Sequence, residues 1–259
     1  MKSLLLRITP VTAALLFVTG SQAAEMSHSN VMRDFTDVVA PAQQQAYEDG
    51  VKTYNQCLRQ HGFKYAWTAW QHETGDTYTY SYTTDPATWG DFDTMYAAGK
   101  ACESVWMSAA NPHLLSETST FYTLDPGMSN MPQGMHPTDG LVEVVEFKIK
   151  EGQAAHDAFK DSARMIFTAV EKTHRPGSAM MLEVEDGGSG APDFILVLPH
   201  KNWADLGNEI QPPLWTMMAN VYGAKKAQEI RKTLGNVTEH TSSHIDRYDA
   251  DLTYTPANH

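Results

Sequence analysis

The chain has 259 residues, of which 19 are basic and 31 acidic, so its net charge is −12 at neutral pH. A negatively charged surface repels phosphate backbones and anionic lipid, which argues against nucleic acid and membrane surfaces as partners. The sequence contains no glycine-rich phosphate loop, dinucleotide fingerprint or GxSxG motif, so it does not indicate a nucleotide-binding protein, a dehydrogenase or a serine hydrolase.

Residues 1–24 have the composition of a signal peptide. Lys2 and Arg7 make a basic start, residues 8–18 are apolar, and the small side chains at 20–24 suit a signal peptidase. The apolar run is too short to span a membrane comfortably. We therefore expect an exported, soluble protein, periplasmic or secreted and without membrane insertion. Its mature chain would keep 19 − 2 = 17 basic residues against 31 acidic ones.

The first half of the mature chain predicts the order β-α-β-β-α-β. Strand-like runs alternate with segments in which apolar residues recur at three- and four-residue steps. A stretch rich in Gly, Pro, Ser and Met, residues 127–138, follows them and is predicted to be a linker. The predicted elements are a strand at 31–39, a helix at 43–60, a hairpin of strands at 65–72 and 78–83, a helix at 93–108 and a strand at 120–124.

The second half predicts the same order of elements. Ala155, Phe159, Ala163 and Phe167 share one face of a predicted helix, which Pro176 helps to end. The predicted elements are a strand at 141–149, a helix at 153–173, strands at 179–185 and 193–198 around a glycine-rich turn, a helical region at 214–234 with a break near Gly223, and a strand at 245–252.

One sequence element occurs twice. Trp89-Gly90-Asp91-Phe92 recurs as Trp203-Ala204-Asp205-Leu206, an offset of 203 − 89 = 114 residues. The pairs His61/His174 and Phe35/Phe147 keep nearly the same offset, which predicts a duplicated module at 27–126 and 139–256. A carboxylate beside an indole is compatible with catalysis. Its presence in both halves favours a helix cap instead, with the Trp wedged between helix and sheet.

A β-α-β-β-α-β unit is the ferredoxin-like arrangement, and two such units can bury their open sheet faces against each other. With this element order and repeat, the chain resembles the dimeric α+β barrel superfamily. The resemblance implies an α+β fold of two tandem ferredoxin-like modules that form an intramolecular barrel. Members include cofactor-independent monooxygenases, haem-degrading enzymes and chlorite-dismutase-like haem proteins, so the fold alone does not select an activity.

The two cysteines, Cys57 and Cys102, both fall on predicted helices of the first module. The fold makes those helices antiparallel neighbours, and an exported protein meets an oxidising compartment. We expect a disulfide between them, the alternative being two buried free thiols. Neither cysteine has CxxC spacing, so a thiol oxidoreductase is not indicated.

The predicted hairpin of the first module is rich in aromatic residues. Tyr78, Tyr80 and Tyr82 alternate with hydroxyl residues, so the tyrosines share one face of the strand. Trp67 and Trp70 lie on opposite faces of the preceding strand, whereas the matching strands of the second module are aliphatic. We interpret Tyr78, Tyr80, Tyr82 and Trp67 as a site for a small apolar or aromatic organic ligand in a barrel cavity. The alternative is ordinary cross-strand packing.

The enzymatic alternative follows from the resemblance, which implies a cofactor-independent monooxygenase or a haem-linked enzyme. For haem, an axial histidine of the second module is expected, with His156, His174 and His200 as the candidates. Sequence spacing alone groups no convergent set of acid, base or ligand residues. The catalytic residues, and whether the chain is an enzyme, stay open at this stage.

The linker contains a candidate copper site. Met128, Met131, Met135 and His136 place three thioethers and one imidazole within nine residues. Soft thioether sulfur prefers Cu(I). The alternative is a flexible linker whose methionines pack against the barrel.

A second, weaker metal pattern lies near the C-terminus. His240 and His244 are four residues apart, so a helix would place them on one face with Asp246 close by. Two histidines without a clear third ligand are weak evidence for a metal site.

Overall fold

The computed structural model describes residues 29–131 and 140–257. The predicted signal peptide, Met135 and His136 lie outside these ranges. Within them, no helix combines the length and apolar character needed to cross a membrane.

The first half of the chain forms four strands with helices between them. Its elements are β1 (Val31–Val39), the 3₁₀ turn η1 (Pro41–Gln43), α1 (Gln44–Gln60), β2 (Trp67–His72), β3 (Thr79–Thr84), α2 (Trp89–Gly99), η2 (Lys100–Cys102), α3 (Glu103–Ala109), η3 (Asn111–His113) and β4 (Leu114–Ser129).

The second half repeats this alternation of strands and helices. Its elements are β5 (Leu141–Ile149), α4 (Gln153–Thr173), β6 (Met180–Asp186), β7 (Phe194–His200), α5 (Trp203–Leu206), α6 (Leu214–Tyr222), α7 (Ala224–Val237) and β8 (Thr238–Tyr254).

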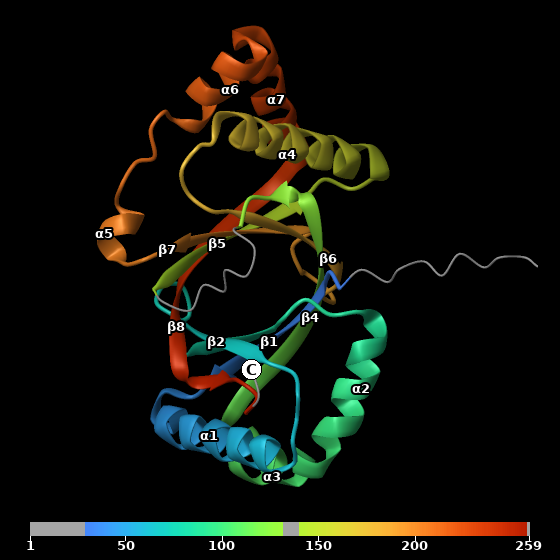
Figure 1. The fold of residues 1–259 in the computed structure, drawn as a ribbon, viewed down its shortest axis with the longest axis vertical. Helices are drawn as coiled ribbons and strands as arrows, with labels where there is room; N and C mark the ends of the chain where they lie inside the picture. Colours follow the sequence, from blue (N-terminus) through green and yellow to red (C-terminus); the bar gives the residue numbers. More distant parts are fainter. Residues whose placement is uncertain (1–28, 132–139, 258–259) are drawn as a thin grey trace, which may run out of the picture.

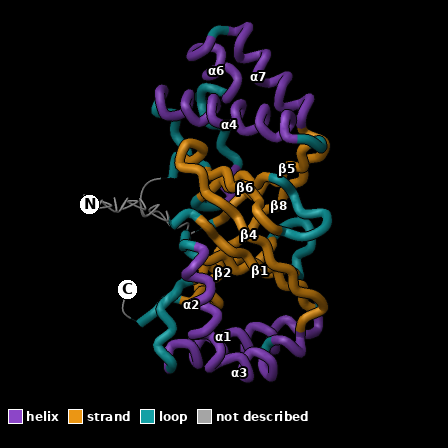
Figure 2. Tube along the Cα trace, turned by 90° about the vertical axis from the view of Figure 1, so that its right-hand side faces the viewer, coloured by secondary structure: helices purple, strands orange, loops and turns teal. Residues whose placement is uncertain are grey.

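The eight strands close into one barrel in the order β1-β3-β2-β8-β5-β7-β6-β4. Every neighbouring pair is antiparallel. The two halves meet along two seams, β2 with β8 and β4 with β6. The fold is therefore mixed α+β with an eight-stranded antiparallel barrel. Figure 1 shows the barrel between two helical layers, α1 and α3 at one end and α4, α6 and α7 at the other, and Figure 2 shows the same layers from the side.

Several predicted elements have the observed bounds. The strands at 31–39 and 141–149 and the helix at 153–173 match β1, β5 and α4. The helical break predicted near Gly223 also occurs, because this residue separates α6 from α7 with a φ of 84°, a value that glycine adopts without strain.

Other elements differ from the prediction. The closing strands β4 and β8 are much longer than the predicted 120–124 and 245–252, and β4 extends to Ser129, into the predicted linker. Many of the residues beyond the predicted bounds are exposed and polar, so they show no apolar alternation in the sequence. Backbone pairing with β1 and β5 holds them in the sheet. The predicted helix at 93–108 is divided into α2 and α3 by η2.

The repeated Trp-x-Asp element caps a helix in both halves. Thr88 and Asp91 form a reciprocal capping box at the start of α2, and the Asn202 side chain accepts from the Asp205 amide at 3.0 Å at the start of α5. The capping prediction is thus confirmed. The predicted wedging of the tryptophans is wrong, because Trp89 and Trp203 are 55% and 45% exposed. Each Trp is the first residue of its helix, and the half-exposed Trp89 ring contacts Phe121 of β4 with centroids 5.0 Å apart.

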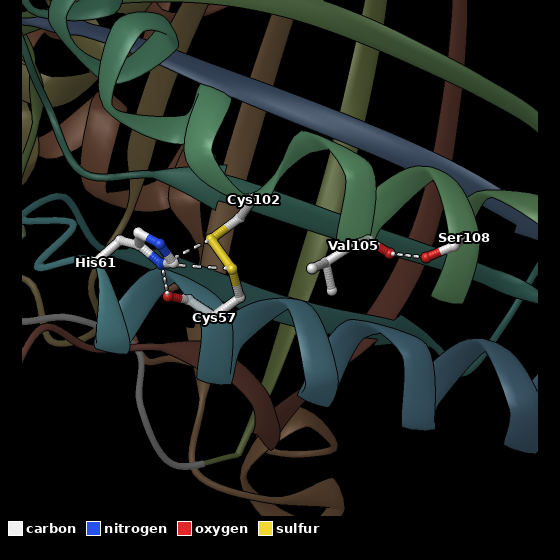
Figure 3. The surroundings of a disulfide bond; sticks show 5 residues. All are labelled: Cys57, His61, Cys102, Val105 and Ser108. Atoms are coloured by element: carbon white, nitrogen blue, oxygen red, sulfur yellow. Dashed lines mark hydrogen bonds between the residues drawn. A yellow bond between two sulfur atoms is a disulfide. The ribbon is translucent and has the colours of Figure 1, made fainter.

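The predicted disulfide joins Cys57 on α1 to Cys102 on η2, with Cα atoms 5.9 Å apart and a sequence separation of 45 (Figure 3). It ties α1 to the turn between α2 and α3. Beside it, His61 Nδ1 lies 3.6 Å from each sulfur and 2.9 Å from the Cys57 carbonyl oxygen. The bond therefore fixes the helical layer that covers the first half of the barrel.

Replacing both cysteines in the double variant Cys57→Ala/Cys102→Ala should lower the free energy of unfolding by about 3–4 kcal/mol, because a loop of this length is no longer closed in the unfolded chain. Urea denaturation without reductant measures the loss. Adding reductant should destabilise the wild type by a similar amount and leave the double variant unchanged. Equal stability of the two proteins without reductant would contradict the role given to this bond.

Candidate functional site

The alternation of side chains along β1 and β3 divides the polar residues of the first half between two spaces. Tyr82 and Asp37 face the helices, whereas Ser81, Thr83 and Asp34 face the barrel interior. The predicted alternation of tyrosines and hydroxyl residues is therefore present. The tyrosines of β3 lie on the outer face of the barrel, under α1. The prediction that they lie inside a barrel cavity is therefore wrong.

The first space is a cavity of about 230 Å³ between the sheet and the helices α1 and α3, which we call the helix–sheet pocket. Gly50 lets the two helices approach closely, because a Cβ at this position would lie 2.2 Å from the Ala109 carbonyl oxygen. The walls are mainly aromatic and apolar, with two carboxylates among them. The lining residues are Phe35, Asp37, Val51, Tyr54, Trp67, Tyr82, Thr84, Trp106 and Glu117.

Asp37 is the most unusual of these residues, since it is a carboxylate only 1% exposed. The Tyr47 hydroxyl donates to its Oδ2 at 2.5 Å, and the Tyr47 and Tyr82 hydroxyls are 2.8 Å apart. Its Oδ1 has no hydrogen-bond partner within residues 29–131 and 140–257. Burial raises the pKa of Asp37 to about 7, against the Tyr47 hydrogen bond, and the neighbouring Glu117 carboxylate raises it further.

The hydroxyls beside Asp37 act as donors at neutral pH. Burial raises the pKa of both Tyr47 and Tyr82 well above 10, so both remain protonated. When Asp37 is ionised, the order Tyr82 to Tyr47 to Asp37 lets each hydroxyl donate its single proton. This chain holds Oδ2 and leaves Oδ1 without a hydroxyl donor, while the Glu117 carboxylate, which pairs with Asp37 across β1 and β4, lies close enough to share the Asp37 proton.

The pocket wall also contains an unused donor. The Trp67 ring lies between Tyr54 and Tyr254, with centroids 6.2 and 4.8 Å away. Its Nε1 is buried and has no hydrogen-bond partner in the described part of the chain. The pocket therefore has flat aromatic walls, and one unpartnered acceptor and one unpartnered donor are buried among the residues that line it.

The structure divides the predicted ligand site. Tyr82 and Trp67 line the pocket, but Tyr80 is fully buried under α1, where its hydroxyl donates to Glu48 at 2.9 Å. Tyr78 is 39% exposed. Asp37 was not among the predicted site residues, although a carboxylate within the strand-like run 31–39 was a visible signal.

The second space is the barrel interior, a cavity of about 450 Å³. Its wall has two different sides. The first half contributes polar side chains from β1, β2 and β3, including Asp34, Thr36, His72, Ser81 and Thr83. The second half contributes mainly apolar ones from β5, β6 and β7, including Val142, Val144, Leu182, Ile195 and Val197.

Two histidines and an aspartate meet on the polar side of the interior. His72 and His244 stack with ring centroids 4.5 Å apart, and both Nε2 atoms lie near the buried Asp246 carboxylate. Burial lowers the pKa of His72. Burial also acts to lower the pKa of His244, but the Asp246 hydrogen bond and the charges of Asp246, Glu146 and Asp34 raise it overall.

This cluster differs from the metal pattern predicted near the C-terminus. His240 and His244 lie on the strand β8, where a helix was assumed, and His240 is exposed. The second imidazole beside His244 comes from His72, which pairs with Asp246 across the β2–β8 seam. Sequence spacing could not reveal this partner.

The methionines of the predicted copper site line different spaces. Met128 is fully buried in the core beneath α4, together with Phe159, Met181 and Phe194. Met131 lines the barrel interior. Met135 and His136 lie outside the described residues, so copper binding stays a prediction.

The predicted haem ligands do not fit that role. His156, His174 and His200 line neither of the two cavities described above. His156 Nε2 is 3.2 Å from Glu183, and its ring packs against Phe194 at 4.8 Å. Large buried side chains such as Phe159 and Phe167 fill the space beneath α4.

No protein-family model and no curated protein matches the sequence. Solved structures match the fold. An anthrone oxidase-like protein is 11% identical with a TM-score of 0.55, over 89% of this chain and 95% of its own. A protein proposed to be a monooxygenase, from Lactobacillus acidophilus, is 9% identical with a TM-score of 0.54, over 87% and 96%. A mutant chlorite dismutase from Candidatus Nitrospira defluvii is 10% identical with a TM-score of 0.52, over 86% and 93%. These likenesses support the α+β barrel fold.

The raised pKa of Asp37 predicts a pH-dependent stability. The unfolded chain releases this proton near pH 4, whereas the folded protein holds it until about pH 7. The folded state therefore binds more protons in this window, and raising the pH destabilises it. Between pH 5 and 8, the titration of Asp37 should lower the unfolding free energy of the wild type by about 2–3 kcal/mol. Asp37→Asn should lack this part of the decrease.

Urea denaturation at both pH values measures this effect. Asp49→Asn is the matched control, because Asp49 is exposed on α1 and its removal should leave the wild-type pH dependence. Asp34 contributes a separate part of the pH dependence of stability, since burial raises its pKa to about 6. An Asp37→Asn variant with the full wild-type pH dependence would show that Asp37 titrates normally.

Proposed function

We propose that the chain is an enzyme that binds a small, flat aromatic molecule in the helix–sheet pocket and uses Asp37 as a general base. The single observation that supports this most is Asp37 Oδ1, a buried acceptor without a partner at the wall of an aromatic cavity. A pKa of about 7 suits a base that works near neutral pH. The enzyme alternative is thereby favoured over a purely binding protein.

The pocket residues divide the work of binding and proton transfer. Trp106 and Tyr54 offer aromatic surface to a flat ring, and the Trp67 indole N–H is a donor for an oxygen atom on that ring. Tyr47 holds the other carboxylate oxygen of Asp37. Asp37 Oδ1 can then take a proton from an acidic C–H or O–H group of the ligand.

The fold neighbours suggest the reaction class, since one of them is anthrone oxidase-like and another is proposed to be a monooxygenase. For an anthrone, Asp37 takes a proton from the CH₂ carbon, and the resulting enolate reduces O₂. The Asp37 proton returns to give a hydroperoxide, which loses its remaining C–H proton as the O–O bond breaks. The products are the quinone and one water, so O₂ is the oxidant and no cofactor is consumed.

We also propose that the two halves are tandem ferredoxin-like modules and that the mature protein is exported. Each half orders its strands as fourth, first, third and second, β4-β1-β3-β2 and β8-β5-β7-β6, which supports a duplication. The Cys57–Cys102 bond and the predicted signal peptide support an oxidising compartment.

Anthrone is a defined test substrate for this function. Wild-type protein should consume one O₂ for each anthraquinone formed, with a rate that rises as Asp37 ionises near pH 7. Asp37→Asn should lower kcat about 10²–10⁴-fold, because the base is lost while the pocket keeps its shape. Oxygen consumption and quinone absorbance measure both quantities.

Asp34→Asn is the matched control, since Asp34 lies on the same strand but faces the barrel interior, and it should keep most of the activity. Trp67→Phe should raise KM with kcat retained, because it removes only the indole donor. Binding of anthrone without turnover would support a ligand-binding protein and overturn the general-base role. Equal loss of activity in Asp34→Asn and Asp37→Asn would place the site elsewhere.

A further inference from the structure

The barrel interior contains a group of side chains that the proposed reaction does not use. His72 on β2 and His244 and Asp246 on β8 each offer one ligand atom, and these atoms all lie within 4.8 Å of one another. His244 Nε2 is 3.3 Å from Asp246 Oδ2, and His72 Nε2 is 3.6 Å from Asp246 Oδ1. The three residues are brought together by the β2–β8 seam.

Asp246 is the unexplained member of this group. Its side chain is 4% exposed, and its Oδ1 has no hydrogen-bond partner within the described ranges. The atom that faces it, His72 Nε2, lies 3.2 Å from Ser81 Oγ, but too far from Asp246 for a hydrogen bond. A buried carboxylate oxygen without a partner is costly and needs a cation or a donor beside it.

The donor set fits one kind of cation. Two imidazole nitrogens and one carboxylate are typical ligands of zinc, cobalt and non-haem iron. Ligand atoms at about 2.0–2.2 Å from a shared ion lie about 3–3.5 Å apart, close to the two separations observed here. We propose that His72, His244 and Asp246 form a mononuclear site for a divalent first-row transition metal in the barrel interior.

The surroundings suit such a site. Glu146 and Asp34 also line the interior, and they supply further negative charge close to the three ligands. The opposite wall is apolar, so three protein ligands would leave coordination positions that face a largely apolar cavity. A metal bound to both Nε2 atoms would turn the two rings out of their present stack, in which the ring planes differ by 16°.

This site is independent of the helix–sheet pocket. None of its three ligands lines that pocket, and Asp37 does not line the barrel interior. The two proposals can therefore fail separately. The metal site needs a test that does not measure turnover.

Cobalt is the probe, since its visible absorption reports both binding and coordination. Wild-type protein is treated with a chelator, dialysed without reductant so that the disulfide stays intact, and titrated with CoCl₂. We expect the protein to bind one equivalent of cobalt, with the d–d absorption bands of Co(II) that has fewer than six ligands. Asp246→Asn and His72→Gln should each weaken the affinity by more than about 100-fold, the upper end of what an outer-shell change typically costs.

Two matched variants exclude other sites. His240→Gln removes an exposed imidazole of the same strand, and His136→Gln removes the imidazole of the methionine-rich segment, so both should bind cobalt as the wild type does. Loss of binding in His136→Gln alone would assign the metal to that segment and overturn the proposal. So would an absence of stoichiometric cobalt binding in the wild type, or unchanged binding in both ligand variants.

A second measurement covers variants that fail to fold. One equivalent of zinc added to wild-type protein should shift the imidazole NMR signals of two histidines and leave the others in place. Shifts spread over many histidines, or none at all, would contradict the site.

Discussion

Two seams of backbone hydrogen bonds, β2 with β8 and β4 with β6, close the eight strands into one barrel and determine where every strand side chain points. A closed barrel has no free edge, so each strand residue faces either the interior or the outside, and helical layers cover part of that outside. A register slip of one residue would exchange the two sets. The placement of the polar residues therefore depends on the closure and not on local sequence alone.

This constraint separates two kinds of chemistry on one strand. On β1, Asp34 faces the barrel interior and Asp37 faces the helices, and burial raises the pKa of both. On β3, hydroxyl residues take the inner side and tyrosines the outer side. The same alternation in the second half buries aliphatic, methionine and phenylalanine side chains, which fill the space beneath α4. The first half carries most of the candidate chemistry, and the second half supplies an apolar wall.

The β2–β8 seam is the exception to this division, because it brings polar residues of the second half to the first. Asp246 pairs in register with His72, and His244 lies two residues before it on the same face of β8. Neither half could assemble this group alone. The seam therefore contributes a candidate site as well as stability.

The sequence predicted the parts of the fold that depend on local pattern. The apolar spacing of α4, the strand-like runs of β1 and β5 and the repeated helix cap indicated these elements with nearly correct bounds. The disulfide followed from the antiparallel helices of the expected fold. The long ends of β4 and β8 were not predictable, because backbone pairing and not burial holds their exposed residues.

The candidate sites were harder to predict for a different reason. Tyr82 and Trp67 were identified, but sequence alternation does not tell which face of a sheet meets the helices. His72 and Asp246 are far apart in the chain and meet only through the seam register. Asp37 was visible as a carboxylate in a strand-like run, yet its hydrogen bond from Tyr47 and the effect of Glu117 on its pKa involve residues of other elements.

A crystal structure of the protein, from crystals soaked with anthraquinone, tests the central claim most directly. The claim is that the aromatic ligand binds at a site separate from the barrel interior. The account predicts flat density in the helix–sheet pocket beside Trp67 and Trp106, with a ligand oxygen within hydrogen-bond distance of the indole N–H. Density for the quinone inside the barrel, against His72 and His244, would contradict it.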